Sequence, residues 1–266
     1  MKKIYLLFIL LPFCALAQDA QTIERILSQE LPSDKGEKMI TLASNFLGRP
    51  YIASTLEGNK EELKCRLDGF DCYTLVETTT ALYLCKQKGY DSYEAFLDQM
   101  QLLRYRDGII DGYTSRIHYF FEWAKRAEEK GYLQDVGSTI GVKNNKKINF
   151  MSTHRQYYSA FKTNNEVWED IKYMEEDLAE FPFYYIPKDQ YKAKKSQLKH
   201  GDIIAFTSNL GGLDVNHEGM VYIKNGEVHF LHASSEEKKV IISTETLETY
   251  MNRIPKHNGL MVLRMN

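Results

Sequence analysis

The sequence GFDCYTLV, at residues 69–76, places Cys72 directly after an acid, where a run of helix-forming residues begins. A cysteine is nucleophilic as the thiolate, and the N-terminus of a helix favours that charge. We therefore expect a helix from Cys72 to about Lys88. The thiol at its start should have a lowered pKa and react rapidly with iodoacetamide near pH 6. Taken alone, the feature also fits a buried cysteine that packs as a small hydrophobic residue.

Two histidines lie in a predicted β-hairpin, HEGMVYIKNGEVHFLHASS, at residues 217–235. Asn225-Gly226 is a typical two-residue hairpin loop. With that loop, the alternation of side chains puts His217 and His232 on one face, as diagonal neighbours with Cβ atoms roughly 7 Å apart. Such a pair could serve a thiol nucleophile, because one imidazole accepts the proton while a second polar group fixes the tautomer of the first.

The register of the hairpin decides which histidine is the second one. With a two-residue loop, Gly219 lies across from His232 and leaves space there, while His229 lies on the opposite face beside Tyr222. A loop with an odd number of residues would slip the register by one and turn His229 to the active face instead. The prediction is His232, with His229 as the alternative.

The same residues fit two other interpretations. Two histidines and a cysteine are potential zinc ligands, but the usual close ligand spacings are absent and no second cysteine accompanies the hairpin. We therefore expect no metal and no cofactor. The histidines could also be ordinary core residues.

The first 17 residues predict export. Lys2 and Lys3 precede an apolar run at 4–16, and Ala15-Leu16-Ala17 forms a small-x-small cleavage site before Gln18. This is the pattern of a signal peptide, and the run is short for a bilayer span. We expect a signal peptide at 1–17 and a mature protein secreted across the inner membrane into the periplasm, without stable membrane insertion. A retained membrane anchor is the alternative.

Charge and cysteine content narrow the class of protein further. Without Lys2 and Lys3, 34 − 2 = 32 basic residues face 36 acidic ones, so the mature net charge is 32 − 36 = −4. This charge gives no indication of nucleic-acid binding. Three cysteines remain in the mature chain, and in an oxidising compartment an odd number leaves at least one thiol free. A disulfide between Cys65 and Cys85 would leave Cys72 free, and this pairing stays open.

The remaining sequence predicts an α+β fold, with helices first and an antiparallel sheet in the C-terminal part. Periodicity and helix-ending residues predict helices at about 20–31, 36–47, 72–88, 92–105, 114–131 and 165–180. Residues 133–163 read as mostly irregular, and short β-rich segments follow from 201 onwards. We expect one catalytic domain at 18–266, with a helical part at about 18–190, a sheet part at about 200–266 and a helical and loop elaboration between. We also expect a monomer.

The motifs GRPYIAST, FDCYTLVE, GDIIAF, NHEGMVYI and FLHASS, in this order, resemble the NlpC-type cell-wall cysteine peptidases, which have a papain-like fold. The stretches INFMSTHRQYY, GGLDVNHEG, LHASSEEKKVII and GLMVLR resemble a narrower branch, the N-acetylmuramoyl-L-alanine amidase-like proteins. The resemblance runs from about residue 40 to the C-terminus.

The resemblance implies a role for each catalytic position. Cys72 would attack an amide carbonyl, His217 would act as general base and then acid, and His232 would orient His217. The hydroxyl of Tyr51, with the Cys72 backbone N–H, would stabilise the oxyanion; a tyrosine packed near a turn is the alternative. Many members place the two histidines about 12 residues apart; here His217 and His232 are 15 apart, and His229 is the residue 12 away.

The resemblance also implies the substrate. An exported amidase would cleave the bond between N-acetylmuramic acid and L-alanine in peptidoglycan fragments (muropeptides). The alternatives are a γ-D-glutamyl–diamino-acid endopeptidase and a non-catalytic muropeptide-binding protein. Because muropeptides carry carboxylates and acetamido groups, we expect cationic and planar donors at the site. The candidates are Arg116, His118, His154, Arg155 and Asp214. On one ideal helix the first two would point about 200° apart, so both could line a cleft only if the helix begins after them.

Overall fold

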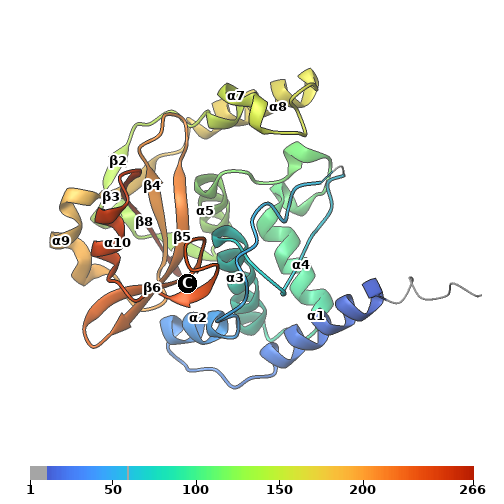
Figure 1. The fold of residues 1–266 in the computed structure, drawn as a ribbon, viewed down its shortest axis with the longest axis vertical. Helices are drawn as coiled ribbons and strands as arrows, with labels where there is room; N and C mark the ends of the chain where they lie inside the picture. Colours follow the sequence, from blue (N-terminus) through green and yellow to red (C-terminus); the bar gives the residue numbers. More distant parts are fainter. Residues whose placement is uncertain (1–10, 59) are drawn as a thin grey trace, which may run out of the picture.

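The computed structural model describes residues 11–58 and 60–266, with helices in the first part of the chain and most strands in the last (Figure 1). The helices are α1 (Leu11–Leu27), α2 (Lys35–Ser44), α3 (Cys72–Lys88), α4 (Tyr93–Arg104), α5 (Phe120–Glu129), α6 (Gly137–Ile140), α7 (Phe150–Thr153), α8 (Asn165–Leu178), α9 (Tyr191–Lys194) and α10 (Leu247–Arg253). The strands are β1 (Leu133–Asp135), β2 (Val142–Asn144), β3 (Phe183–Pro187), β4 (Ile203–Ser208), β5 (Val215–Lys224), β6 (Glu227–Ser234), β7 (Lys239–Ile242) and β8 (His257–Met265). The fold is therefore α+β, as predicted.

The strands form one antiparallel sheet in the order β2-β3-β8-β4-β5-β6-β7, with β1 also paired to β8. The β5–β6 hairpin has the predicted two-residue loop, with Lys224 opposite Glu227 and Val221 opposite Phe230. A Cβ built on Gly219 would lie 3.1 Å from the Cβ of His232, so this glycine faces that histidine. The predicted register is confirmed from the loop to Met220.

The sheet separates two apolar layers. Met220 and Leu231 point into the larger one, with α1 to α5, whereas Val221 and Phe230 point into a smaller one that includes α9 and α10. Figure 1 shows these two sets of helices on opposite sides of the strands. Because side chains alternate along a strand, neighbouring residues of β5 belong to different layers.

Helix α3 lies at the centre of the larger layer, and every residue from Thr74 to Cys85 is buried. Asp71 starts the helix with a capping box and Gly89 ends it in the left-handed conformation. The buried carboxylate of Glu77 accepts from the Arg104 guanidinium at 2.9 Å, which joins α3 to α4. Contacts with β5 and β6 hold the other side of the helix. The start of α3 is therefore fixed relative to the sheet.

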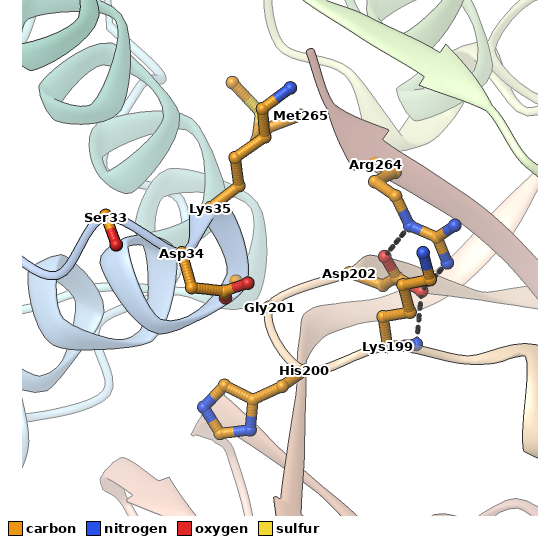
Figure 2. Close-up of a pocket in the computed structure, with 10 residues that line it drawn as sticks. Ser33, Asp34, Lys35, Lys199, His200, Gly201, Asp202, Arg264 and Met265 are labelled. Atoms are coloured by element: carbon orange, nitrogen blue, oxygen red, sulfur yellow. Dashed lines mark hydrogen bonds and ion pairs between the residues drawn. The ribbon is translucent and has the colours of Figure 1, made fainter.

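A tight seam joins the start of α2 to the segment that enters β4 (Figure 2). Gly201 has a φ of +80°, and a Cβ on it would lie 2.4 Å from the Cα of Gly36, so no side chain fits. Beside the seam, Arg264 donates to both carboxylate oxygens of the buried Asp202 at 2.7 Å. This arrangement fixes the sheet against α2 as well as α3.

Most predicted elements are confirmed, with one error that matters for the site. The helix expected at 114–131 begins only at Phe120. Residues 113–115 form a single 3₁₀ turn, and the chain is extended at Arg116 and at Tyr119. Arg116 bridges to Tyr105, and Ile117 donates its N–H to the Arg104 carbonyl, so pairing with the end of α4 replaces the first turns of the helix.

Three further predictions, on the disulfide, the signal peptide and membrane insertion, can be compared with the described residues. Cys65, Cys72 and Cys85 are free thiols, so the Cys65–Cys85 disulfide does not form. Residues 1–10 of the predicted signal peptide lie outside the described residues, and α1 begins at Leu11, inside the predicted signal sequence. Within residues 11–58 and 60–266, no helix has both the length and the apolar character needed to cross a bilayer.

Candidate active site

Cys72 is the first residue of α3, and its sulfur lies against β5. The carboxyl and the backbone N–H of Glu218 both lie next to the thiol. The same peptide group joins Glu218 to His217, whose Cα lies ~2.4 Å from that nitrogen by covalent geometry. The start of α3 therefore meets a peptide of β5 that lies 217 − 72 = 145 positions further along the chain. The structure brings the predicted nucleophile to the peptide that joins His217 to Glu218.

The ring of His217 is held by a second histidine. Its Nε2 lies 2.7 Å from the Nδ1 of His232, and both side chains are buried. A cage of aromatic rings on the same side of the sheet surrounds His217, with centroids at 5.8 Å for Phe206, 6.3 Å for Phe230 and 5.9 Å for Tyr250. A bulge in β5 next to His217 shifts the register against β4, as bulges beside functional sites often do.

This arrangement leaves one nitrogen of His217 available. Among the hydrogen bonds of the described residues, none involves its Nδ1. A histidine whose one nitrogen is committed to an orienting partner presents the other for proton transfer. His232 therefore occupies the position of an orienting residue, and Nδ1 of His217 is the nitrogen that can accept a proton.

His229 lies elsewhere, opposite Tyr222 on the other side of the hairpin. Its Nδ1 lies 3.0 Å from the Ser243 carbonyl and 3.1 Å from that of Glu245. Of the two histidines left open by the sequence, His232 is the one that contacts His217.

Tyr51 lies next to the nucleophile. It bridges in parallel to Phe70, and its N–H donates to the Lys238 carbonyl at 2.9 Å, which ties residues 50–52 to both the start of α3 and β7. Burial, and then the proximity of Cys72, raise the pKa of Tyr51 to about 12. The hydroxyl therefore keeps its proton at neutral pH and can donate a hydrogen bond.

The resting site favours neutral groups. Burial, followed by the charges of Glu218 and Asp71, raises the pKa of the Cys72 thiol well above its usual value. Burial, followed by His232, lowers the pKa of His217 well below its usual value. The expectation of a lowered thiol pKa from the helix N-terminus is therefore wrong for the resting protein, because desolvation and two neighbouring acids act in the opposite direction.

A cavity of about 280 Å³ lies beside the nucleophile. Its lining includes Tyr73, which follows Cys72 in α3, and Glu218, which contacts the sulfur. Three further tyrosines contribute polar aromatic surface: Tyr113, Tyr119 and Tyr158. We call this cavity the tyrosine pocket.

Three predicted substrate-binding residues line the tyrosine pocket: Arg116, His118 and Asp214. The first two share it because α5 begins after both, which is the condition the sequence left open. Arg116 is neutralised by Glu57 at 2.9 Å and Glu61 at 3.2 Å. The expected exposed cation is therefore already paired.

Apart from the paired Arg116, the tyrosine pocket offers no cation to a ligand among its described polar groups. Burial lowers the pKa of His118 well below its usual value, and its Nε2 lies 2.8 Å from the Tyr113 carbonyl. Burial raises the pKa of Asp214 to about 6, although Phe121 donates its N–H to this carboxylate. The pocket suits a neutral polar ligand part, such as an acetamido or peptide group, better than a free carboxylate.

His154 and Arg155 do not line the tyrosine pocket. The His154 ring stacks on Phe150 at 4.0 Å, and Arg155 donates to the Phe161 carbonyl at 2.7 Å while its guanidinium lies over Trp168. These contacts organise the segment around α7 and α8.

Sequence reasoning missed Glu218. An acid inside the apolar strand sequence HEGMVYI is the signal that could have found it, because charged residues are seldom fully buried without a partner.

Within the described part of the chain, no group of three or more histidine, cysteine or acidic residues has the arrangement of a metal site.

Comparison with known proteins identifies the family. Residues 41–260 match the AmiA-like family, described as N-acetylmuramoyl-L-alanine amidase-like. The chain belongs to this family. No curated protein matches the sequence.

The chain is also similar to solved structures. An N-acetylmuramoyl-L-alanine amidase from Bacteroides uniformis superposes with a TM-score of 0.83 at 38% identity, over 87% of this chain and 99% of that one. A Bacteroides fragilis protein, named provisionally as a xylanase, superposes with a TM-score of 0.80 at 38% identity, over 85% of this chain and 100% of that one. A Legionella pneumophila protein shares the fold with a TM-score of 0.72 at 21% identity, over 95% of this chain and 96% of that one.

The capping residue Asp71 gives a direct test of the site's electrostatics. Because its charge raises the thiol pKa of Cys72, Asp71→Asn should speed alkylation of this thiol by iodoacetamide at pH 7.5 severalfold while keeping the cap. Asp71→Ala should do the same and lose ~1 kcal/mol of stability. Peptide mapping by mass spectrometry and urea unfolding measure the two effects.

The matched control is Asp34→Ala, which removes the side-chain cap of α2 far along the chain from Cys72. It should destabilise the protein and leave the alkylation rate of Cys72 unchanged. An Asp71→Asn thiol that reacts at the wild-type rate or more slowly would contradict the account.

Proposed function

We propose that this protein is an exported cysteine amidase that hydrolyses the amide between N-acetylmuramic acid and L-alanine in muropeptides. The observation that carries the proposal is the contact of the Cys72 sulfur with the peptide between His217 and Glu218, while His217 is bonded to His232. Membership of an amidase-like family supports the choice of bond. The order of cysteine, base and orienting residue is that of a papain-like, NlpC-type hydrolase, and we include this assignment in the proposal.

The mechanism begins with two neutral partners. His217 Nδ1 removes the proton of Cys72 as the sulfur attacks the lactyl carbonyl carbon of the muramoyl group. The resulting imidazolium is stabilised by His232, which fixes the ring through Nε2. Because both groups are neutral at rest, the ion pair forms only when a substrate carbonyl receives the attacking electrons.

The tetrahedral oxyanion needs donors that are already in place. The Cys72 backbone N–H is one, because the first N–H groups of a helix have no partner within it. The Tyr51 hydroxyl is the second, since its raised pKa keeps it protonated. Such a donor typically contributes about 3–4 kcal/mol to the transition state.

The reaction then proceeds through an acyl-enzyme. His217 gives its proton to the nitrogen of L-alanine, the C–N bond breaks, and the stem peptide leaves as an amine. The muramoyl group remains on the sulfur as a thioester. Water attacks this thioester with His217 as base, which releases the muramoyl acid and restores the thiol.

Substrate selection is assigned to the tyrosine pocket. Arg116, His118 and Asp214 form part of its wall; the charge of Arg116 is paired, burial disfavours the charged form of His118, and Asp214 is an acid. We propose that the pocket binds a neutral part of the muropeptide next to the scissile bond. His154 and Arg155 then act indirectly, through the position of Tyr158 and Met151 in the same segment.

The remaining parts of the proposal concern the whole chain. Residues 1–17 act as a signal peptide, and residues 18–266 form one catalytic domain that works as a monomer in the periplasm. The apolar run at 4–16 and the cleavage sequence before Gln18 support export.

Product analysis tests the reaction. Mass spectrometry of a digested disaccharide tetrapeptide should detect the intact stem peptide with a free L-alanine amine. Cys72→Ala should abolish release while the variant still folds and binds the substrate. A released muramoyl-dipeptide would establish the endopeptidase alternative. Binding without cleavage by the wild type would establish the binding-protein alternative. Cleavage of xylan would favour the function named for the Bacteroides fragilis relative.

Substitution of His232 and of His229 tests whether a histidine must contact the His217 ring to support catalysis. Because His232 fixes the ring of His217, His232→Ala should lower kcat/KM by roughly 10²-fold or more. His229→Ala is the matched control and should leave kcat/KM near the wild-type value, since its ring contacts carbonyls on the other side of the hairpin. Equal losses in both variants would remove His232 from the mechanism.

A further inference from the structure

Glu218 is the one acid that contacts the proposed nucleophile and also lines the tyrosine pocket, among the described residues. Its side chain points into the larger apolar layer, opposite to His217, because neighbours alternate along β5. The residue is 6% exposed. It therefore connects the reacting sulfur to the cavity where we place the substrate.

The carboxyl of Glu218 has no cationic partner. No ion pair with it is present in the described part of the chain, and its Oε2 is buried without a hydrogen-bond partner. The cationic group of the pocket, Arg116, is already paired with Glu57 and Glu61. An ionised carboxylate in this position would be an uncompensated buried charge, which is strongly unfavourable.

The groups that surround Glu218 compensate little for the burial of a charge. Those from the start of α3, the 50–52 segment and the chain before β5 are thiol, phenol or acid, and the remaining titratable groups line the pocket beyond it. They are, in this order, Cys72, Asp71, Tyr73, Tyr51, Asp214, Glu57, Tyr113, Arg116, His118, Tyr119 and Tyr158. Burial raises the pKa of Glu218 to about 8; the neighbouring Cys72 thiol opposes this shift, and the charge of Asp214 adds to it.

We propose that Glu218 is a positioning residue that works as a neutral carboxylic acid: it contacts the Cys72 sulfur and donates its proton to an acceptor oxygen of the ligand in the tyrosine pocket. This inference rests on the proposed function for the identity of the ligand, but not for the contact with the sulfur. The acceptor is a carbonyl or ether oxygen, because a carboxylate would meet Asp214 and Glu57 in the same cavity. The proton stays on Glu218 throughout, since His217 is the base.

The protonation state controls the nucleophile. A neutral Glu218 places no charge next to the sulfur, whereas an ionised Glu218 opposes formation of the thiolate and imidazolium pair. The contribution of the neutral acid is therefore present at low and neutral pH. It is lost as the pH rises through the pKa of about 8.

Two variants separate the roles of shape, donor and charge. Glu218→Gln keeps the size and one N–H donor but cannot ionise, and Glu218→Met keeps the size without any hydrogen bond. At pH 7, Glu218→Gln should retain kcat/KM within about threefold of wild type, and Glu218→Met should lose about tenfold or more, as expected for one buried hydrogen bond. Above pH 8.5 the wild-type kcat/KM should fall, and Glu218→Gln should keep its activity. A Gln variant as impaired as the Met variant, or with the wild-type pH profile, would overturn the proposal.

A second readout does not depend on the substrate. The rate of Cys72 alkylation by iodoacetamide, followed by peptide mapping from pH 6 to 10, should be roughly tenfold higher in Glu218→Gln than in wild type at pH 9, where the wild-type Glu218 is ionised. The matched control is Glu175→Gln, a second buried glutamate with an unpartnered Oε2 that bonds Tyr119 instead of the thiol. It should leave the profile unchanged.

The two readouts distinguish failures. If no muropeptide is cleaved while the alkylation profile shifts as stated, the proposed reaction is wrong and the role of Glu218 at the thiol stands. If muropeptides are cleaved while the profile is identical in wild type and Glu218→Gln, the role of Glu218 is wrong and the reaction stands.

Discussion

The contact between the start of α3 and one peptide group of β5 is the constraint on which the site depends. It places the Cys72 sulfur against the backbone of Glu218, the residue that follows His217 in β5. Burial of α3 on the larger face of the sheet, together with the Glu77–Arg104 pair, keeps the helix from moving along its axis. A shift of one residue along β5 would place a different side chain at the start of α3, because β-strand side chains alternate.

The same packing determines the electrostatics. Exclusion of water raises the pKa values of Cys72 and Glu218 and lowers that of His217, so three groups that could carry charge are neutral at rest. In such an environment a newly formed charge interacts strongly with nearby dipoles. These three groups therefore carry little charge before substrate binds. The hydrogen-bond donors at Tyr51 and at the helix start act when the oxyanion develops.

Local signals in the sequence predicted the parts of the site that depend on local structure. The helix start at Cys72 follows from a capping acid and helix-forming residues, and the His217–His232 pair follows from a two-residue loop and strand alternation. These rules involve neighbours within about 15 positions, where the chain itself fixes the geometry.

The errors concern groups whose surroundings come from distant segments. The helix predicted at 114–131 starts too early, since the observed helix begins at Phe120. Arg116 and Ile117 pair with the end of α4 instead, and the periodicity of the sequence does not encode this contact. Glu218 was missed because its importance depends on Cys72. The thiol pKa was predicted in the wrong direction because the helix terminus is local, while desolvation by the whole fold is not.

The most direct measurement of the central claim is the mass of the covalent intermediate. Muropeptide is mixed with the wild-type protein, the reaction is quenched in acid within milliseconds to seconds, and the peptides are mapped. The account predicts a thioester on Cys72 that carries the muramoyl sugar without any amino acid of the stem. An adduct on Cys65 or Cys85, or one on Cys72 that retains L-alanine, would contradict it.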